Sequence, residues 1–213
     1  ARAEDPIRIG FLSTFSGPGG QLGQELLDGF NLGLAATGGK LGGRTVEVVQ
    51  GDDQAKPDVG RQVADKMIER DKVQILTGIN FSNVMLAVAK SALDAGTFVV
   101  SVNAGPSQYA GAQCHPHFFV ASFQNDTSPE AMGLEATKRG IKKMYLMAPN
   151  YPAGKDFLAG FKRTFKGEVV GEVYTAFGQL DYAAEIAQVR AAAPEGVFFF
   201  YPGGMGINFV KQY

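Results

Sequence analysis

The sequence predicts an α/β protein built from two doubly wound lobes, each with a parallel sheet between layers of helices. Short apolar runs alternate regularly with stretches of helical periodicity along the 213 residues. The apolar runs lack a polar face, which is typical of parallel strands covered by helices on both sides. A stretch rich in glycine and proline at residues 103–116 interrupts the alternation, which then resumes. This interruption indicates a second lobe of the same class.

The first lobe is expected in residues 1–120, with the order β-α-β-α-β-α-β. Apolar residues at helical spacing begin near Gln21, and two pairs of glycines end this first helix. Pro57 suits the first turn of the second helix. Ser82 suits the N-terminal cap of the third helix. The strands are expected at residues 7–12, 45–49, 73–77 and 97–101.

The second lobe is expected in residues 121–213, with the boundary near residue 120. Phe157, Phe161 and Phe165 share one stripe of a helix in this part of the chain. The other helices are expected at residues 128–139 and 182–192 and from Met205 onward. The strands after the interruption are expected at residues 118–122, 143–148, 169–174 and 197–201.

The bulk composition argues against several classes of partner. The net charge is −1 and 19% of the residues are charged, so neither a nucleic acid nor an anionic membrane surface is indicated. No apolar run reaches the roughly 18 residues that a membrane span needs. The single cysteine, Cys114, cannot form a disulfide within the chain. Ala1-Arg2-Ala3 fits the pattern beside a signal-peptidase cut, and equally a remnant of cloning.

We expect no catalytic residue, metal or cofactor. The sequence holds neither a G-x-S-x-G nor an H-E-x-x-H motif. His115 and His117 flank a proline without an acid at metal-ligand spacing, so they are interpreted as surface residues. Cys114 lies next to these histidines in the sequence, so a reactive thiol is the alternative interpretation of this segment.

The loop at residues 16–23 lies where dinucleotide enzymes hold a pyrophosphate. Leu22 stands where a G-x-G-x-x-G pattern needs glycine, and the lysine of a phosphate-binding loop is missing. Asp52 and Asp53 follow the second strand, where an acid can bind a ribose. A nucleotide-dependent enzyme therefore stays as an alternative.

Polar and aromatic residues follow several of the predicted strands. Free amides in the loop from Gly78 to Ser82, together with the Ser82 hydroxyl, suit a carboxylate, although Ser82 can equally serve only as a helix cap. The next strand is followed by Asn103-Ala104-Gly105-Pro106, which is expected to form the second wall of a ligand cleft beside Ser82. Tyr151 and Tyr201 follow strands of the second lobe, where each can stack on a flat ligand or only cover the core.

At these residues the chain resembles the branched-chain amino-acid type of periplasmic binding protein, which has the type 1 periplasmic fold. The resemblance covers essentially the whole chain, and it is carried by the order and spacing of the elements rather than by one of them. These elements are Ser16-Gly17-Pro18 with Gly23, Gly38-Gly39, Asp52-Asp53 with Pro57, Gly78 to Ser82, Tyr151-x-x-Gly154, and Met205-Gly206.

The resemblance implies the solute receptor of an ABC importer, in which two lobes close on a small carboxylate. Ser82 and the loop at residues 103–105 would hold the carboxylate, and Tyr151 and Tyr201 would close over it. It also implies a monomer without enzymatic activity, located in the periplasm after loss of a signal peptide, with a membrane permease as partner. The full set of expected ligand-binding residues is Leu22, Asn80, Phe81, Ser82, Asn103, Ala104, Gly105, Asn125, Tyr151 and Tyr201.

Three departures from the family favour an aromatic acid of the benzoate or phenylpropanoid type. Asn125 stands where members that bind amino acids often carry an acid, which weakens pairing with an ammonium group. Gly105-Pro106 replaces a threonine and leaves room for a bulkier ligand. Ala55 and Phe81 replace a disulfide found in some members, and Phe81 brings a ring beside the carboxylate site.

Three alternatives stay open at this point. The ligand can be a branched-chain or other aliphatic amino acid, the chain can be a nucleotide-dependent enzyme, or it can be a sensory or regulatory domain of the same fold. Members of the family continue for a further stretch. Residues 1–213 are therefore expected to hold a complete first lobe and part of the second.

Overall fold

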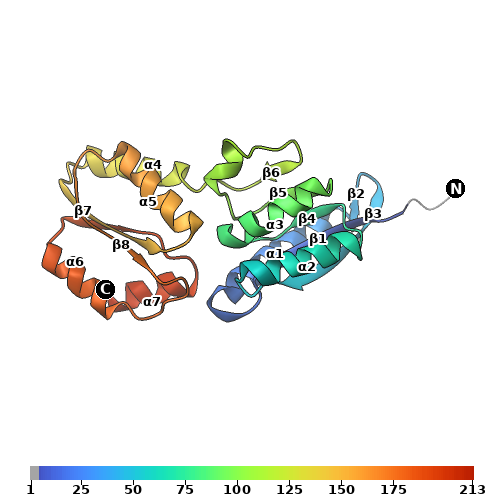
Figure 1. The fold of residues 1–213 in the computed structure, drawn as a ribbon, viewed down its shortest axis with the longest axis horizontal. Helices are drawn as coiled ribbons and strands as arrows, with labels where there is room; N and C mark the ends of the chain where they lie inside the picture. The colour runs from blue at the N-terminus through green and yellow to red at the C-terminus, as the bar shows by residue number, and fades with distance from the viewer. Residues whose placement is uncertain (1–4) are drawn as a thin grey trace. The chain divides into compact units, whose positions relative to one another are not determined.

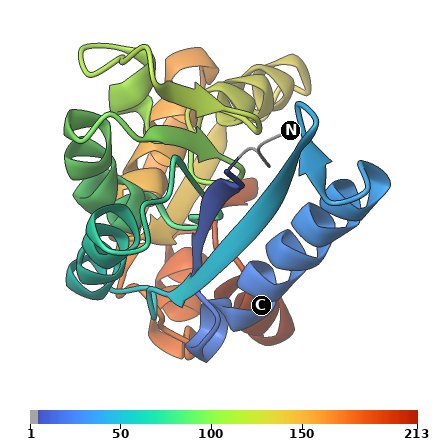
Figure 2. The same ribbon diagram turned by 90° about the vertical axis from the view of Figure 1, so that its right-hand side faces the viewer.

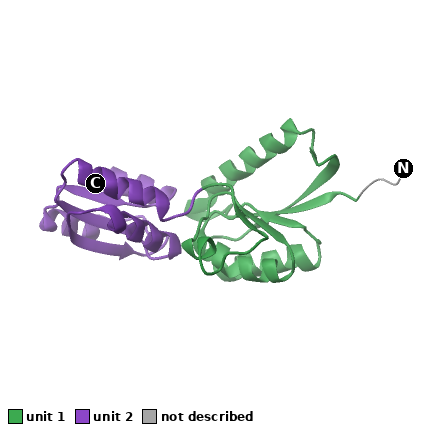
Figure 3. Cartoon of the chain, turned by 90° about the horizontal axis from the view of Figure 1, so that it is seen from above, with its two compact units in different colours: residues 1–122 green, residues 123–213 purple. Residues whose placement is uncertain are grey.

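The computed structural model describes residues 5–213, so the Ala1-Arg2-Ala3 pattern lies outside the described residues. The chain forms two compact units, residues 1–122 and 123–213, which Figure 3 colours separately. Each unit is a mainly parallel sheet between layers of helices, as Figure 1 shows for both. The α/β class predicted from the sequence is confirmed.

Unit 1 holds a six-stranded sheet in the order β2-β3-β1-β4-β5-β6. All neighbouring strands are parallel except β2 and β3. The central strand β1 contributes Ile9, Phe11 and Leu12 to the core, each at most 2% exposed. The strands are β1 (Ile7–Ser13), β2 (Lys40–Leu41), β3 (Arg44–Asp52), β4 (Ile75–Thr77), β5 (Phe98–Ser101) and β6 (Phe118–Val120).

Two strands of this sheet depart from the sequence-based expectation. The two glycine pairs were expected only to end a helix, but between them β2 pairs antiparallel with β3. A two-residue strand is too short to show a period in the sequence. The strand after the irregular stretch pairs with β5, so it completes the sheet of unit 1 rather than opening that of unit 2.

Helices cover both faces of the unit 1 sheet. Helix α1 (Gly20–Ala36) lies on one face, and Figure 2 shows α2 (Pro57–Glu69) and α3 (Ser82–Asp94) on the other. Phe30 of α1 contacts Phe11 of β1, with their ring centroids 5.2 Å apart. Two short 3-10 turns, at Gly17–Gly19 and Ser107–Ala110, lie in the connections.

Unit 2 holds a parallel sheet in the order β8-β7-β9 between two pairs of helices. The side chains of the central strand β7 alternate between the two faces. Met144 and Leu146 pack toward α4 and α5, whereas Tyr145 and Met147 pack toward α6 and α7. Its elements are α4 (Thr127–Lys138), β7 (Lys143–Pro149), α5 (Pro152–Thr164), β8 (Glu168–Thr175), α6 (Ala183–Ala192), β9 (Gly196–Phe199) and α7 (Gly204–Gln212).

Candidate functional site

Asn80 connects the ends of three strands at the carboxyl end of the unit 1 sheet. It lies three residues after β4 and is 3% exposed. Its Oδ1 accepts hydrogen bonds from the Thr14 amide (3.0 Å) and the Ser13 hydroxyl (3.5 Å), just after and at the end of β1. Its backbone carbonyl accepts a hydrogen bond from Asn103 Nδ2 (2.8 Å), after β5. The structure thus brings the two predicted walls of unit 1 together.

The loop after β5 is also attached through Ala104. The Ala104 amide donates to the carbonyl of Ile79 (3.4 Å), and the Ser101 hydroxyl donates to the carbonyl of Ala104. Ala104, Gly105 and the following proline are buried. The backbone of this predicted binding loop is therefore held in one place by contacts inside unit 1.

The start of α3 differs from the expected cap. Phe81 is the N-terminal cap residue, and its own side chain makes no capping hydrogen bond; Ser82 is the first helical residue and is 2% exposed. The interpretation of Ser82 as a helix cap is wrong, because its hydroxyl lies one position too late. The first backbone ladder bond runs from the Met85 amide to the Phe81 carbonyl (3.0 Å). Amides before this first ladder bond have no acceptor within the helix, and the start of a helix is the kind of place where anions bind.

The ring of Phe81 packs against the turn at Gly17–Gly19. A Cβ on Gly19 would lie 2.6 Å from this ring, so glycine is needed for the contact. Phe81 is 2% exposed. Leu22 lies in the first turn of α1 and is half-buried, and its expected role in binding stays a prediction.

Three buried polar atoms of this region have no hydrogen-bond partner among the described residues. They are Asp53 Oδ2, Asn80 Nδ2 and Asn83 Oδ1. Buried polar atoms are normally satisfied, so each of them is a place for a water or a ligand group. The sequence pattern did not single out Asn83, although its place in the first turn after the Gly78 loop was a usable signal.

Asp52 and Asp53 fasten the loop that follows β1. Asp52 Oδ1 accepts from the amides of Phe15 and Gln54, both at 2.9 Å. Burial acts to raise the pKa of Asp52, but these hydrogen bonds outweigh it and lower the pKa. Asp53 Oδ1 accepts from the Thr14 hydroxyl and from a backbone amide, while burial raises the pKa of Asp53. The two acids thus have a structural role that requires no ribose.

Aromatic rings gather at the carboxyl end of the unit 2 sheet. Tyr151, after β7, is 6% exposed, and its ring lies 4.8 Å from that of Phe177, after β8. Phe200, after β9, stacks on Tyr151 at 6.4 Å and on Phe157 at 3.7 Å. Burial raises the pKa of the Tyr151 phenol far above its usual range, and the charge of Asp156 adds to this effect. We call Tyr151, Phe157, Phe177 and Phe200 the aromatic cluster.

The sequence predicted only one member of the aromatic cluster. Helical spacing predicts Phe157 on one stripe with Phe161 and Phe165, and the structure agrees. Phe157 stacks on Phe200 and Phe161 on Phe198, and both partners pack against the same core. The signal for Phe177 and Phe200 was their place just after a strand, which is the same signal that singled out Tyr151.

Asn125 has an acidic partner that the sequence did not reveal. Its side chain is buried, at 2% exposure, and Nδ2 donates to Asp156 Oδ2 at 3.1 Å. Asn125 in place of an acid is expected to weaken pairing with an ammonium group, and this stays a prediction. The structure adds that α5 supplies a carboxylate, Asp156, beside the same position.

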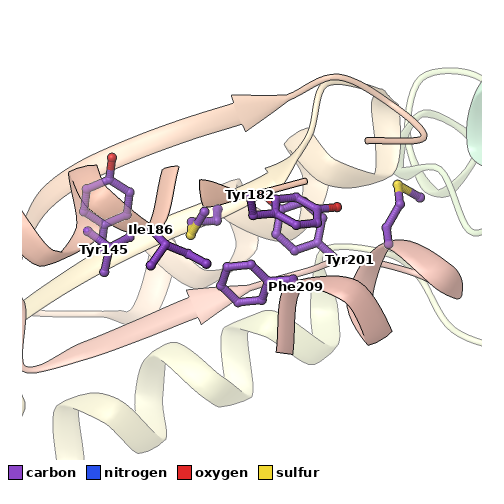
Figure 4. Close-up of a cluster of buried hydrophobic side chains, with 8 residues drawn as sticks. Tyr145, Tyr182, Ile186, Tyr201 and Phe209 are labelled. Carbon is purple, nitrogen blue, oxygen red and sulfur yellow. The ribbon is translucent and has the colours of Figure 1, made fainter. Parts of the chain in front are cut away.

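Tyr201 lies in the core of unit 2. Figure 4 shows its ring with those of Tyr182 and Phe209, at centroid distances of 4.8 and 5.2 Å. Tyr201 is 7% exposed, and its hydroxyl has no hydrogen-bond partner among the described residues. Burial raises the pKa of this phenol to about 12. These contacts favour the interpretation of Tyr201 as a core residue, and its role in binding stays a prediction.

Replacing Tyr201 by phenylalanine is expected to raise the free energy of unfolding by up to about 1 kcal/mol. The change removes a buried hydroxyl without a partner, whose desolvation costs free energy, and keeps the ring. Denaturant unfolding with and without ligand measures the effect. A loss of stability would show that the nearby Thr175 satisfies the hydroxyl, and a loss confined to ligand affinity would show that the ligand does.

Within residues 5–213, His115, His117 and Cys114 belong to no metal centre. Among residues 5–213, no group of three or more His, Cys, Asp or Glu side chains could hold a metal ion. His117 stacks on Phe98 at 4.4 Å and donates its backbone amide to Nδ1 of His115. Cys114 is exposed. In the same residues, no helix has the length and apolar character to span a membrane.

The sequence profile of the family described as "Periplasmic binding protein" matches residues 6–213. The chain belongs to this family. Among curated members, "Leu/Ile/Val-binding protein homolog 6" of Brucella melitensis biotype 1 is 28% identical over 214 residues. That alignment covers 98% of this chain and 54% of the relative, so the chain spans about half the length of the curated relatives it matches.

Two solved members of the periplasmic binding protein family have nearly the same fold. One is the solute binding protein of an ABC transporter from R. palustris in complex with benzoate, with 32% identity and a TM-score of 0.95. The superposition covers 98% of this chain and 59% of that protein. The other is a solute binding protein from Rhodopseudomonas palustris BisB5 in complex with 3,4-dihydroxybenzoic acid, with 31% identity and a TM-score of 0.92. The superposition covers 98% of this chain and 58% of that protein. The resemblance and the type 1 periplasmic fold predicted from the sequence are confirmed.

Proposed function

We propose that this chain is the ligand-binding part of an ABC importer's solute receptor, and that its ligand is a small aromatic carboxylate. The observation that carries the ligand class is the aromatic cluster of unit 2. Tyr151, Phe177 and Phe200 follow three different strands, yet their rings meet at one end of the sheet. A flat aromatic ligand gains both burial and ring contacts from such a surface.

The carboxyl end of the unit 1 sheet supports the acid group of the ligand. It offers the start of α3 at Ser82, the amide of Asn80 with its unsatisfied Nδ2, and the buried loop at Ala104 and Gly105. Amides and hydroxyls at a helix start stabilise a carboxylate without needing a cation. The ligand would contact both units, and closure of the two lobes would be favoured because only the closed state makes all of these contacts.

The ligand named for the benzoate-bound relative fits this proposal. The relative named for leucine, isoleucine and valine supports the second candidate, an aliphatic amino acid. The position of the Asp156 carboxylate beside Asn125 favours the second candidate, because a carboxylate can pair with the α-ammonium group of an amino acid. In both cases the receptor would act without catalysis, outside the cytoplasm, and would deliver its ligand to a membrane permease.

A thermal-shift series with the full-length gene product tests the ligand class. Benzoate and 4-hydroxybenzoate are expected to stabilise the protein by an amount that rises with the logarithm of ligand concentration, about 2.7 kcal/mol at one hundred times Kd, whereas leucine and isoleucine are not. Isothermal titration calorimetry then gives the Kd of each ligand. Stabilisation by leucine alone would replace the aromatic acid by the amino acid as the proposed ligand, and the absence of any concentration-dependent stabilisation would refute both.

A further inference from the structure

A cavity of about 550 Å³ lies within unit 1, between α3 and the segment that connects β5 to β6. We call it the α3 cavity. Its volume falls within the range of about 300–1,000 Å³ that small-molecule sites occupy. Half of its lining residues belong to α3 and half to the connecting segment. It therefore has two walls of different origin, and each contributes its own chemistry.

The wall formed by α3 is apolar at its floor and electrically neutral at its rim. Leu86, Lys90, Leu93 and Asp94 line the cavity, and their spacing places them on one side of the helix. Leu93 is 6% exposed and Leu86 is half-buried. The ammonium group of Lys90 lies 2.5 Å from the Asp94 carboxylate, and both side chains are mostly exposed. The two charges at the rim thus pair with each other.

The wall formed by the connecting segment is folded onto itself. The amides of Gly111 and Gln113 donate to the carbonyl of Gln108, at 3.3 and 3.0 Å. The ring of Tyr109 is 8% exposed and stacks on Phe118, with ring centroids 4.3 Å apart. Ordered connections as long as residues 102–117 are uncommon in compact domains and are often functional. The wall is therefore formed before any ligand arrives.

The polar groups of this second wall are uncharged. Nδ1 of His115 accepts a hydrogen bond from the His117 amide at 3.1 Å, so the neutral imidazole carries its hydrogen on Nε2 and donates from there. Gln108 and Gln113 add two carboxamides, and neither side chain makes a hydrogen bond within the described part of the chain. Burial raises the pKa of the Tyr109 phenol, which keeps it a neutral donor. The wall thus offers both donors and acceptors without a net charge.

We propose that the α3 cavity is a second small-molecule site, which takes an uncharged ring compound that carries one amide or hydroxyl group. The ring would be buried against Leu86, Leu93 and Tyr109, and its polar group would bond to the carboxamides and the imidazole. An anion is disfavoured, because the charge of Lys90 is already paired with Asp94 and the anion would lose hydration without a free cation in return. The proposal does not depend on the proposed function, because the cavity lies entirely in unit 1.

The test is a titration of the isotope-labelled full-length gene product with benzamide, followed by NMR of the backbone amides. Benzamide has the ring of benzoate with a neutral amide in place of the acid. The amides of Asp94 and Gln113 are expected to shift saturably and to fit one site. Asp94 lies twelve residues after Ser82 on α3, about 18 Å along the helix, so the Ser82 amide reports separately on the candidate functional site. Excess benzoate is expected to leave the Kd at the cavity unchanged.

Three variants separate the cavity from the rest of the surface. Gln113→Trp fills the mouth of the cavity from an exposed position and is expected to raise the Kd of benzamide about tenfold or more. Gln62→Trp makes the same change at an exposed position of α2 outside the lining and is expected to leave the Kd unchanged. Leu86→Ala removes part of the apolar floor, should raise the Kd about fivefold, and serves as the test if Gln113→Trp perturbs the fold.

The location of the shifts decides between the proposal and its failure. Shifts confined to Ser82 or to unit 2 would make benzamide a ligand of the candidate functional site only. The absence of saturable shifts, or equal binding in Gln113→Trp, would show that the cavity holds no such ligand. A Kd that rises with benzoate concentration would overturn the preference for a neutral group. Each of these results leaves the proposed function standing, whereas benzoate that fails to bind beside a normal benzamide titration would refute the proposed function alone.

Discussion

Replacing Gly154 by alanine is expected to lower the free energy of unfolding by about 3 kcal/mol, the upper range for overpacking. Gly154 lies in the first turn of α5, and a Cβ there would lie 2.0 Å from the carbonyl oxygen of Pro149. That oxygen belongs to the backbone at the end of β7 and cannot rotate away. Either α5 or the strand end must move, and Tyr151 lies between them.

The same contact recurs after other strands of the protein. A Cβ on Gly23 would lie 1.9 Å from the carbonyl oxygen of Thr14, and one on Gly206 would lie 2.3 Å from that of Tyr201. In each case a glycine early in a helix lets the helix approach a carbonyl at the end of the preceding strand or just after it. These are three of the glycines in the motifs that carry the family resemblance. Their physical role is close packing of strand end and helix, which fixes the loops between them.

A matched control for Gly154→Ala is Gly33→Ala, in the exposed part of α1. A Cβ on Gly33 meets nothing within 4 Å, so alanine is expected to stabilise the protein by about 0.5–1 kcal/mol through its helix propensity. Denaturant unfolding of both variants therefore gives shifts of opposite sign. Equal changes in the free energy of unfolding for the two variants, or no loss of stability in Gly154→Ala, would contradict the close approach of Gly154 to the Pro149 carbonyl. Affinity for the ligand should fall only in Gly154→Ala, because Tyr151 moves with the loop.

The fold was largely predictable because its signals are local. Apolar runs and helical periods located the main strands and helices, and a parallel sheet followed from runs without a polar face. The exceptions depend on pairing. β2 is only two residues long, and nothing in the sequence could assign β6 to the sheet of unit 1, because that depends on its pairing with β5.

The candidate site was predictable only in part. Residues that follow strands, such as Asn80, Asn103 and Tyr151, were found because parallel strands end on the same side of a sheet. Asp156 was missed because it lies inside a helix, and its contact with Asn125 joins positions 31 residues apart. Periodicity cannot show such a contact. It placed Phe157 on the correct stripe of α5 but could not show that its ring meets Phe200.

Replacing Asn80 by alanine is expected to lower the free energy of unfolding by about 2–4 kcal/mol. Asn80 Oδ1 accepts from the Thr14 amide and the Ser13 hydroxyl, and both donors are buried. Without the acceptor, each buried donor is left unsatisfied at a cost of about 1–3 kcal/mol. The end of β1 would lose its attachment to the loop after β4. Because the start of α3 follows that loop, affinity for a carboxylate ligand should fall as well.

The readout for Asn80→Ala is denaturant unfolding combined with hydrogen exchange at the Thr14 amide. Thr14 is expected to exchange much faster in the variant, since its acceptor is gone, while amides inside β1 keep their strand partners. Asn31→Ala, at an exposed position of α1, serves as the control: it should raise the free energy of unfolding by up to about 0.7 kcal/mol through helix propensity and leave exchange at Thr14 slow. Unaltered protection of Thr14 in Asn80→Ala would show that another group holds this strand end. The three connected loops would then not depend on Asn80, and its unsatisfied Nδ2 would be the better guide to its role in binding.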